Sequence, residues 1–305
     1  MQKAPTQKHK LLGIFSALRV YNILLLLVAQ YLAAIFVFTV DKSLETVLLD
    51  YHLHCVVIAT VFTVSAGYII NDFYDAPIDA INKPIKTQIG NWVSNKTKWK
   101  VYFLFNFVAF GLSALVSWRA VVFFSSYIFL IWLYSHKLQK NPTIRVLSIS
   151  ILDVLPFFVI FVYYNNISEF ILLHGAFLFG LIVSKEIVKD LEKTKGALLK
   201  ERQTLVIKYK RKQIKLFLYV ILLVTAVPVC RIIQFPEIGL MRYYFYLYAL
   251  TLPFLIYYIF KSRSFKNYLF LHNMLKFLLV IGVFSLSLID TSVLLIRLLN
   301  RVSLL

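Results

Sequence analysis

The sequence contains little of what a soluble protein of its length is made from. Of its 305 residues, only 15% are charged and 60% are hydrophobic, and the mean hydropathy is +0.76. This composition excludes a soluble globular protein, and no polar stretch is long enough to form a soluble domain. We therefore predict a single integral membrane domain over residues 1–305.

Cysteine is nearly absent as well. Cys55 and Cys230 are the only two, and neither lies in a Cys-x-x-Cys motif, so nothing indicates a zinc site or dithiol redox chemistry. A removable signal peptide is not expected, because no small-residue cleavage site follows the basic segment MQKAPTQKHK. Residues 1–19 are instead predicted to form a basic cytoplasmic tail.

Acidic residues are also scarce, with 14 against 33 lysines and arginines and a net charge of +19. In a soluble chain this charge would suggest nucleic acid. Here the basic residues cluster between apolar runs, which is typical of the cytoplasmic loops of a multi-spanning protein. With the N-terminus inside, 26 of the 33 fall on the cytoplasmic side. We expect contacts with membrane lipids, no nucleic acid, and a bacterial inner membrane as the location.

Nine apolar runs approach the length of about 20 residues that a spanning helix needs. They lie at roughly 20–40, 52–73, 99–117, 120–136, 146–164, 168–189, 213–231, 241–260 and 268–290. The predicted fold class is all-α, a multi-pass membrane helical bundle of about nine transmembrane helices. The basic segment 291–305 could lie along the membrane surface as an amphipathic tail, or the number of spans could be off by one.

An acidic cluster marks the end of the second apolar run, in the stretch AGYIINDFYDAPIDAINKP. Its polar members are Asn71, Asp72, Asp75 and Asp79. At 100° per residue they share one helix face, and such close carboxylates need positive partners, either Lys83 and Lys86 or a divalent cation. Magnesium binds a few carboxylates and completes its shell with water and phosphate oxygens, so the cluster predicts a phosphate-bearing substrate. The alternative is a charged helix end that faces water.

NDFYDAPIDAINKP resembles the NDxxDxxxD motif of the UbiA family of intramembrane aromatic prenyltransferases. Two further segments resemble that family: RVYN at the start of the first apolar run and LYSHKLQK at the end of the fourth. The matching residues are Arg19, Asn22, Tyr134, Ser135, Leu138 and, one place late, Lys140. The resemblance implies a nine-helix fold and Mg²⁺-dependent transfer of an isoprenyl chain from a polyprenyl diphosphate. The acceptor would be lipophilic: an aromatic compound, a quinone precursor or a glycerophospholipid-type molecule.

The segment SKEIVKDLEKTKG resembles the second acidic motif of the family, as written in the branch that includes digeranylgeranylglyceryl phosphate synthase. In the family this motif holds a second magnesium. Here Lys193 and Ala197 stand where that branch carries aspartate. Lys193 could take over part of the charge neutralisation, or a second metal could persist on Asp190 with Glu186 or Glu192. A third interpretation is a non-catalytic protein that binds an isoprenoid lipid or serves as a membrane subunit.

The resemblance also implies roles for individual residues. The metal ligands would be Asn71, Asp72, Asp75, Asp79, Glu186 and Asp190, and the catalytic carboxylates among them would be Asp72, Asp75, Asp79 and Asp190. The resemblance further implies that Asn22, Tyr134 and Lys140 bind substrate. Lys83, Lys86 and Lys189 are expected to bind substrate as well, because they lie beside the acidic motifs.

Two polar residues within spans need separate interpretations. Asp153 could orient the acceptor or act as a base, since a buried acid in a membrane often has a function; equally, it could be a structural acid ahead of Pro156. His174 is expected to form a local hydrogen bond.

Overall fold

The computed structural model describes residues 6–39, 42–193 and 204–290. The predicted tail 291–305, Ala197 and part of the second motif lie outside these residues. Within them the chain is helical and contains no strand. The helices are α1 (Gln7–Leu18), α2 (Val20–Ala33), α3 (Leu44–Leu48), α4 (Tyr51–Asn82), α5 (Pro84–Gly90), α6 (Asn95–Val116), α7 (Trp118–His136), α8 (Pro142–Tyr164), α9 (Glu169–Glu192), α11 (Leu205–Lys208), α12 (Arg211–Ile232), α13 (Arg242–Lys261) and α14 (Phe265–Ser285).

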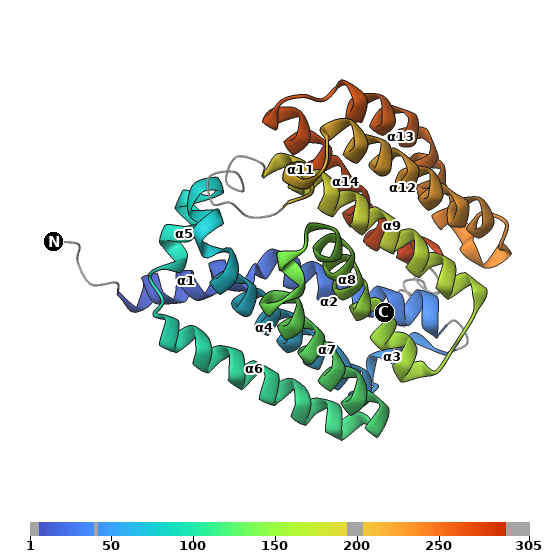
Figure 1. The fold of residues 1–305 in the computed structure, drawn as a ribbon. Coiled ribbons are helices and arrows are strands. Elements are labelled where there is room, and N and C mark those ends of the chain that lie inside the picture. The colour runs from blue at the N-terminus through green and yellow to red at the C-terminus, as the bar shows by residue number, and fades with distance from the viewer. Residues whose placement is uncertain (1–5, 40–41, 194–203, 291–305) are drawn as a thin grey trace.

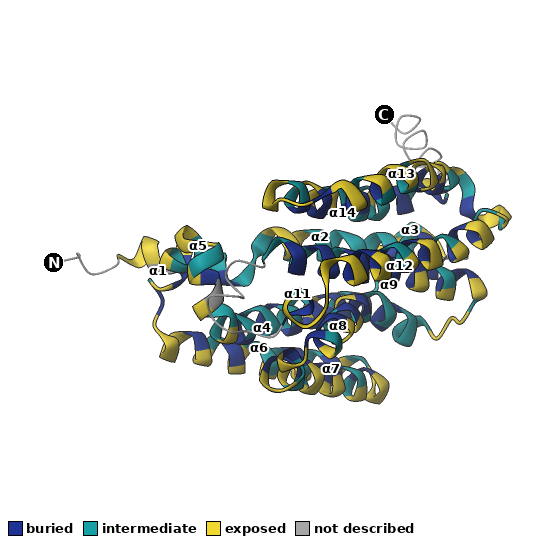
Figure 2. Cartoon of the chain, turned by 45° about the horizontal axis from the view of Figure 1, so that its top comes forward, coloured by how far each residue is buried: buried dark blue, intermediate teal, exposed yellow. Residues whose placement is uncertain are grey.

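Nine helical segments in the described part are long and apolar enough to cross a membrane, which confirms the predicted number. The segments are Val20–Phe38, Tyr51–Pro77, Asn95–Val116, Trp118–Lys140, Pro142–Tyr164, Glu169–Glu192, Arg211–Ile232, Pro236–Lys261 and Phe265–Leu288. Large hydrophobic side chains such as Phe107 and Leu250 are exposed. Figure 2 shows exposed residues along the outer helices, such as α6 and α13. Lipid is the solvent that such an apolar surface requires, so the protein is a multi-pass membrane protein.

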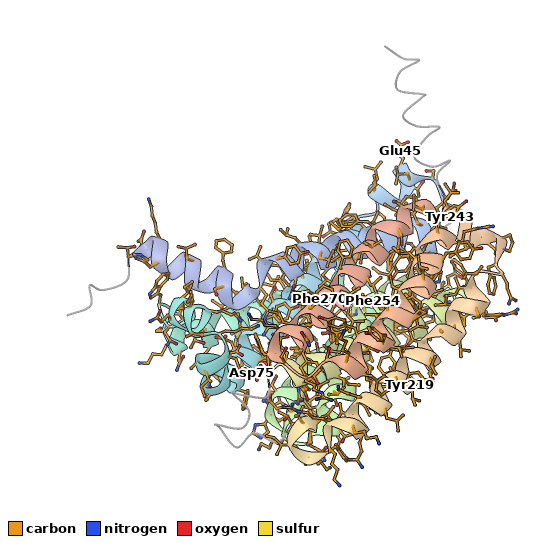
Figure 3. All side chains as sticks on the ribbon, turned by 90° about the horizontal axis from the view of Figure 1, so that it is seen from above. Glu45, Asp75, Tyr219, Tyr243, Phe254 and Phe270 are labelled. Carbon is orange, nitrogen blue, oxygen red and sulfur yellow. The ribbon has the colours of Figure 1, made fainter. Side chains whose placement is uncertain are left out.

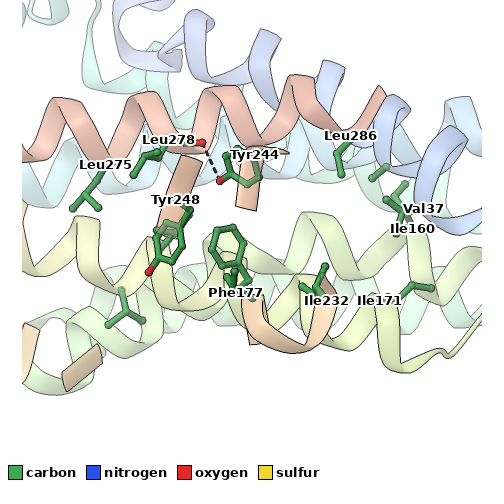
Figure 4. Close-up of a cluster of buried hydrophobic side chains, with 14 of the residues drawn as sticks. Val37, Ile160, Ile171, Phe177, Ile232, Tyr244, Tyr248, Leu275, Leu278 and Leu286 are labelled. Atoms are coloured by element: carbon green, nitrogen blue, oxygen red, sulfur yellow. Dashed lines mark hydrogen bonds between the residues drawn. The ribbon is translucent and has the colours of Figure 1, made fainter. Parts of the chain in front are cut away.

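Helix α9 occupies the middle of the bundle and organises the packing. Figure 1 shows α12, α13 and α14 on one side of α8 and α9, and α4, α6 and α7 on the other. Phe177 of α9 contacts Tyr244 and Tyr248 of α13, and the Tyr244 hydroxyl donates to the Leu278 carbonyl at 3.1 Å (Figure 4). Gly180 permits a close approach to α12, because a Cβ atom there would lie 2.1 Å from Thr225 Oγ1.

Most of the N-terminal segment that the sequence predicts to be a cytoplasmic tail is helical. Residues 7–18 form helix α1, which packs on α5; a Cβ atom on Gly13 would lie 2.7 Å from Val93. The chain then turns at Arg19, whose φ of 52° is left-handed, before α2 begins. This turn lays the guanidinium of Arg19 over the ring of Tyr68 in α4, 4.9 Å from its centroid.

Candidate active site

A cavity of about 510 Å³ opens beside the end of α4 that carries the NDxxDxxxD motif. Figure 3 shows that Asp75, which belongs to that motif, and Glu45 lie toward opposite ends of the bundle. Helices α4 and α9 line the cavity together with parts of α1, α2, α5, α7, α8 and α14. The two acidic motifs, more than 100 residues apart in the chain, therefore meet across one space.

Asn71 and Asp75 form the centre of the first motif. They are one helical turn apart and both line the cavity, and Asn71 Nδ2 donates to Asp75 Oδ2 at 3.1 Å. This contact leaves Asn71 Oδ1 buried without a hydrogen-bond partner among the described residues. A buried carbonyl oxygen left unpaired is costly, and oxygen is the ligand that Mg²⁺ prefers. The pair therefore fits a divalent cation bound on the cavity side.

The other two aspartates of the motif are engaged by lysines. Asp72 does not line the cavity; its Oδ2 accepts from Lys98 Nζ of α6 at 2.8 Å. Asp79 is buried at the cavity wall and lies 3.4 Å from Lys193. Asp72 lies about 100° around the helix from Asn71, so it faces the α4–α6 interface while Asn71 faces the cavity. The prediction that all four polar residues share one helix face is therefore wrong for Asp72. It faces α6, whereas the other three line the cavity.

The Asp72–Lys98 contact leads to a stability prediction. Lys98 is 9% exposed, so Asp72→Ala should leave a buried charge unpaired and lower the free energy of unfolding by about 2 kcal/mol. The double variant Asp72→Ala/Lys98→Met should recover most of that loss and retain activity. Denaturant unfolding of the purified variants in detergent checks this expectation. Equal instability of the single and double variants would exclude the pair as the cause, and a stable but inactive double variant would indicate that Asp72 is a ligand.

The carboxylates of the second motif are buried and paired with basic residues. Glu186 Oε1 lies 3.2 Å from Lys185 Nζ, and Glu186 Oε2 accepts from Lys189 Nζ at 2.6 Å. Asp190 accepts a hydrogen bond from Arg145 of α8. No group of three histidine, cysteine or acidic side chains in the described ranges has an arrangement suited to a metal ion, and this holds for the first motif as for the second. What distinguishes the described carboxylates Glu186 and Asp190 is that each is bound to a side-chain cation.

Arg145, Lys98 and His272 are site residues that the sequence analysis did not identify. His272 of α14 lies within hydrogen-bond distance of Glu192, at the edge of the cavity. In the sequence, Arg145 and Lys98 are recognisable only as basic residues near the ends of helices. Their acidic partners lie 45 and 26 residues away in the chain, so no local pattern connects them. The one available signal was that Arg145 and Lys98 each stand directly before an apolar run.

The residues predicted to bind substrate are mostly brought together. Asn22, Lys83, Lys86, Tyr134 and Lys189 all line the cavity. Lys140 does not: it is exposed at the end of a short 3₁₀ helix, Leu138–Lys140. Asp153 also lines the cavity and lies 3.2 Å from Lys185. His174 is buried elsewhere, and its Nδ1 forms the expected local hydrogen bond, with the Phe170 carbonyl at 2.8 Å.

Basic residues outnumber acidic ones around the cavity. Five carboxylates of the described residues line it: Asp75, Asp79, Asp153, Glu186 and Asp190. Eight lysines and arginines do so: Arg19, Lys83, Lys86, Arg145, Lys185, Lys189, Lys193 and Lys276. The partly enclosed position of Lys83 and the adjacent charge of Lys193 lower the pKa of Lys83 to about 8. The pKa of Lys86 is lowered by burial and then by Arg19. Such crowding of like charges favours an anionic ligand.

Sequence comparisons relate this chain to a known protein family. Residues 27–275 match the model of the UbiA prenyltransferase family. Digeranylgeranylglyceryl phosphate synthase of Methanobrevibacter smithii is 32% identical over 203 residues, which cover 63% of this chain and 67% of that protein. The synthase of Methanothermobacter thermautotrophicus is 30% identical over 142 residues, covering 45% of this chain and 48% of that one. The match therefore spans about half to two thirds of the length of these relatives.

Solved structures resemble the whole bundle. A digeranylgeranylglyceryl phosphate synthase structure superimposes with a TM-score of 0.67 at 20% identity and covers 91% of this chain and 97% of its own. A UbiA homologue from Archaeoglobus fulgidus, bound to GPP and Mg²⁺, gives a TM-score of 0.62 at 14% identity, covering 90% of this chain and 99% of that one. At these identities the likeness shows the fold alone. The family match over most of the chain, the shared fold and the cavity at the NDxxDxxxD motif lead to one conclusion: this chain belongs to the UbiA prenyltransferase family.

Proposed function

We propose that this protein transfers an isoprenyl chain from a polyprenyl diphosphate to a glycerol-phosphate lipid at the cytoplasmic side of the membrane. The observation that carries the proposal is the cavity itself. It combines the oxygen pair of Asn71 and Asp75 with a surplus of lysine and arginine, at the end of an apolar bundle. A diphosphate with a long hydrocarbon tail has the matching chemistry, a compact anion attached to an apolar chain.

The diphosphate would bind where the basic residues converge. Asn71 and Asp75 would hold Mg²⁺, which when bound supplies positive charge against the diphosphate as the allylic carbon–oxygen bond breaks. Lys83 and Lys86, beside the end of α4, would donate hydrogen bonds to phosphate oxygens. The electron pair of the broken bond goes to the diphosphate oxygen, so donors that are already in place stabilise the leaving group. Asp79, Glu186 and Asp190, whose contacts are with lysines or arginine, would act through the position of those cations.

The isoprenyl carbon would react in the apolar part of the cavity. Val64, Ile131 and Leu152 line that part and would keep water from the carbocation. The ring faces of Tyr68 and Tyr127, which also line the cavity, can stabilise positive charge. Asp153, about one third exposed, would accept the proton that the acceptor hydroxyl loses as its oxygen bonds to the isoprenyl carbon.

The named relatives suggest the class of acceptor. Both synthases described above are named for a glycerol phosphate that carries two geranylgeranyl chains. The phosphate of an acceptor that already carries one such chain would bind to the surplus lysine and arginine side chains of the cavity. The non-catalytic alternative is not favoured, because the matched relatives are named as synthases and the Asn71–Asp75 pair is intact.

An assay of the full chain in liposomes tests this proposal. Labelled geranylgeranyl diphosphate and Mg²⁺ are supplied with either geranylgeranylglyceryl phosphate or dihydroxynaphthoate. We expect label to enter the glycerol lipid and not the aromatic acid. Transfer only to the aromatic acid would overturn the acceptor class. No transfer to either, with folded protein, would overturn the catalytic proposal.

A further inference from the structure

The two halves of the cavity differ in whether a buried oxygen atom without a hydrogen-bond partner lies beside a carboxylate. On the α4 side, the oxygen of Asn71 beside Asp75 is buried and has no hydrogen-bond partner among the described residues. On the α9 side, each oxygen of Glu186 already has a lysine, Lys185 at 3.2 Å and Lys189 at 2.6 Å. A cation entering the α9 half would have to displace ammonium groups from a carboxylate that is only 3% exposed. Breaking a buried pair in this way is costly.

Asp190 is no more available than Glu186. It is buried and bound by Arg145, which reaches it from α8. A guanidinium cannot lose its proton at any ordinary pH, so this partner remains a cation. The α9 half of the site therefore already contains positive charge supplied by side chains of the protein.

Lys193 is the basic residue of this half that contacts the first motif. It follows the last residue of α9, is 20% exposed, and lies 3.4 Å from Asp79 of α4. That distance is the longest among the ion pairs between described residues. An ammonium on a flexible stem with so weak a contact can turn to a phosphate oxygen at little cost. Lys189, one turn earlier, also lines the cavity.

We propose that the diphosphate is held between a single divalent cation on Asn71 and Asp75 and the ammonium groups of Lys189 and Lys193, which replace a second cation. This inference rests on the proposed function and specifies how its donor binds. A fixed ammonium cannot be removed by a chelator, so part of the affinity for diphosphate persists without metal. The lowered pKa of Lys83, due to burial and then to Lys193, agrees with a site where positive charges are crowded before an anion arrives.

Binding of inorganic pyrophosphate tests the inference without turnover. The full chain in lipid nanodiscs is dialysed against labelled pyrophosphate with EDTA. We expect binding that Lys193→Asp weakens roughly tenfold or more, the amount typical of hydrogen bonds to charged groups. Lys193→Gln should weaken binding less than Lys193→Asp does. It replaces Lys193→Asp in the experiment if the charge reversal prevents folding. Lys212→Asp is the matched control, because Lys212 is an exposed residue at the start of α12 that does not line the cavity.

A metal count completes the test. With Mn²⁺ and pyrophosphate present, we expect one Mn²⁺ per bound pyrophosphate in the natural chain. Two Mn²⁺ per pyrophosphate, no binding in EDTA, or equal effects of Lys193→Asp and Lys212→Asp would each overturn the inference. Because these readouts need no catalysis, they separate the two proposals. Transfer activity with two bound Mn²⁺ would leave the proposed function standing, whereas one Mn²⁺ with no transfer would overturn only the function.

Discussion

Replacing Asp75 by alanine should lower the rate of isoprenyl transfer by at least about 100-fold, the scale seen when a group that stabilises transition-state charge is removed. Asp75 lines the cavity one turn after Asn71 and is hydrogen-bonded to it. Its loss would remove the carboxylate of the proposed cation site and the contact that orients the amide. The rate is measured in the liposome assay at saturating Mg²⁺.

Two comparisons make the Asp75 result specific. Asp75→Asn keeps the shape and loses the charge, so it should be nearly as inactive as Asp75→Ala. Glu45→Ala removes an exposed acid near the opposite end of the bundle and should leave the rate unchanged (Figure 3). Unfolding of each variant shows whether the fold is intact. Full activity in a folded Asp75→Ala protein would remove the first motif from the site.

Replacing Arg145 by methionine should produce the largest loss of stability of any change considered for this protein, about 3–5 kcal/mol. Arg145 and Asp190 are both buried and bound to each other between α8 and α9. Without its partner, the Asp190 carboxylate must either remain charged away from water or take up a proton. The loss is measured by denaturant unfolding in detergent.

A double variant and a surface pair serve as controls for the Arg145 prediction. Arg145→Met/Asp190→Leu leaves no unpaired charge and should be clearly more stable than Arg145→Met, while transfer stays impaired because the cavity has lost both groups. Arg231 forms an ion pair with Glu169 in which both side chains are 54% exposed. Arg231→Met should therefore change stability little, since solvent screens such pairs. Similar losses for Arg145→Met and Arg231→Met would contradict the argument from burial.

The number and position of the spans were readable from the sequence because the membrane sets a length. A helix must bury its backbone polar groups over about 20 residues, so each apolar run maps to one helix. The bounds moved by a few residues: α4 continues past the predicted end at 73 to Asn82, which carries Asp75 and Asp79 on the same helix. The N-terminal segment was missed as a helix, because nothing in its composition shows that α5 would cover it.

The location of the candidate site could also be predicted from the sequence, because the spacing within a motif is local. Asn71 and Asp75 are four residues apart, and any helix places such residues on one side. The same reasoning could not separate Asp72 from them. Its environment depends on Lys98, which α6 brings to it from 26 residues away.

What the sequence by itself determined is the membrane bundle, the family resemblance and the end of the bundle where the acids gather. All of these follow from hydropathy and helical periodicity, which act over short distances along the chain. Only the tertiary structure decided which acids face the cavity and which cation each one meets. Arg145 with Asp190 and Lys193 with Asp79 lie on different helices, and the rotation and approach of packed helices, which no local pattern encodes, determine these pairs.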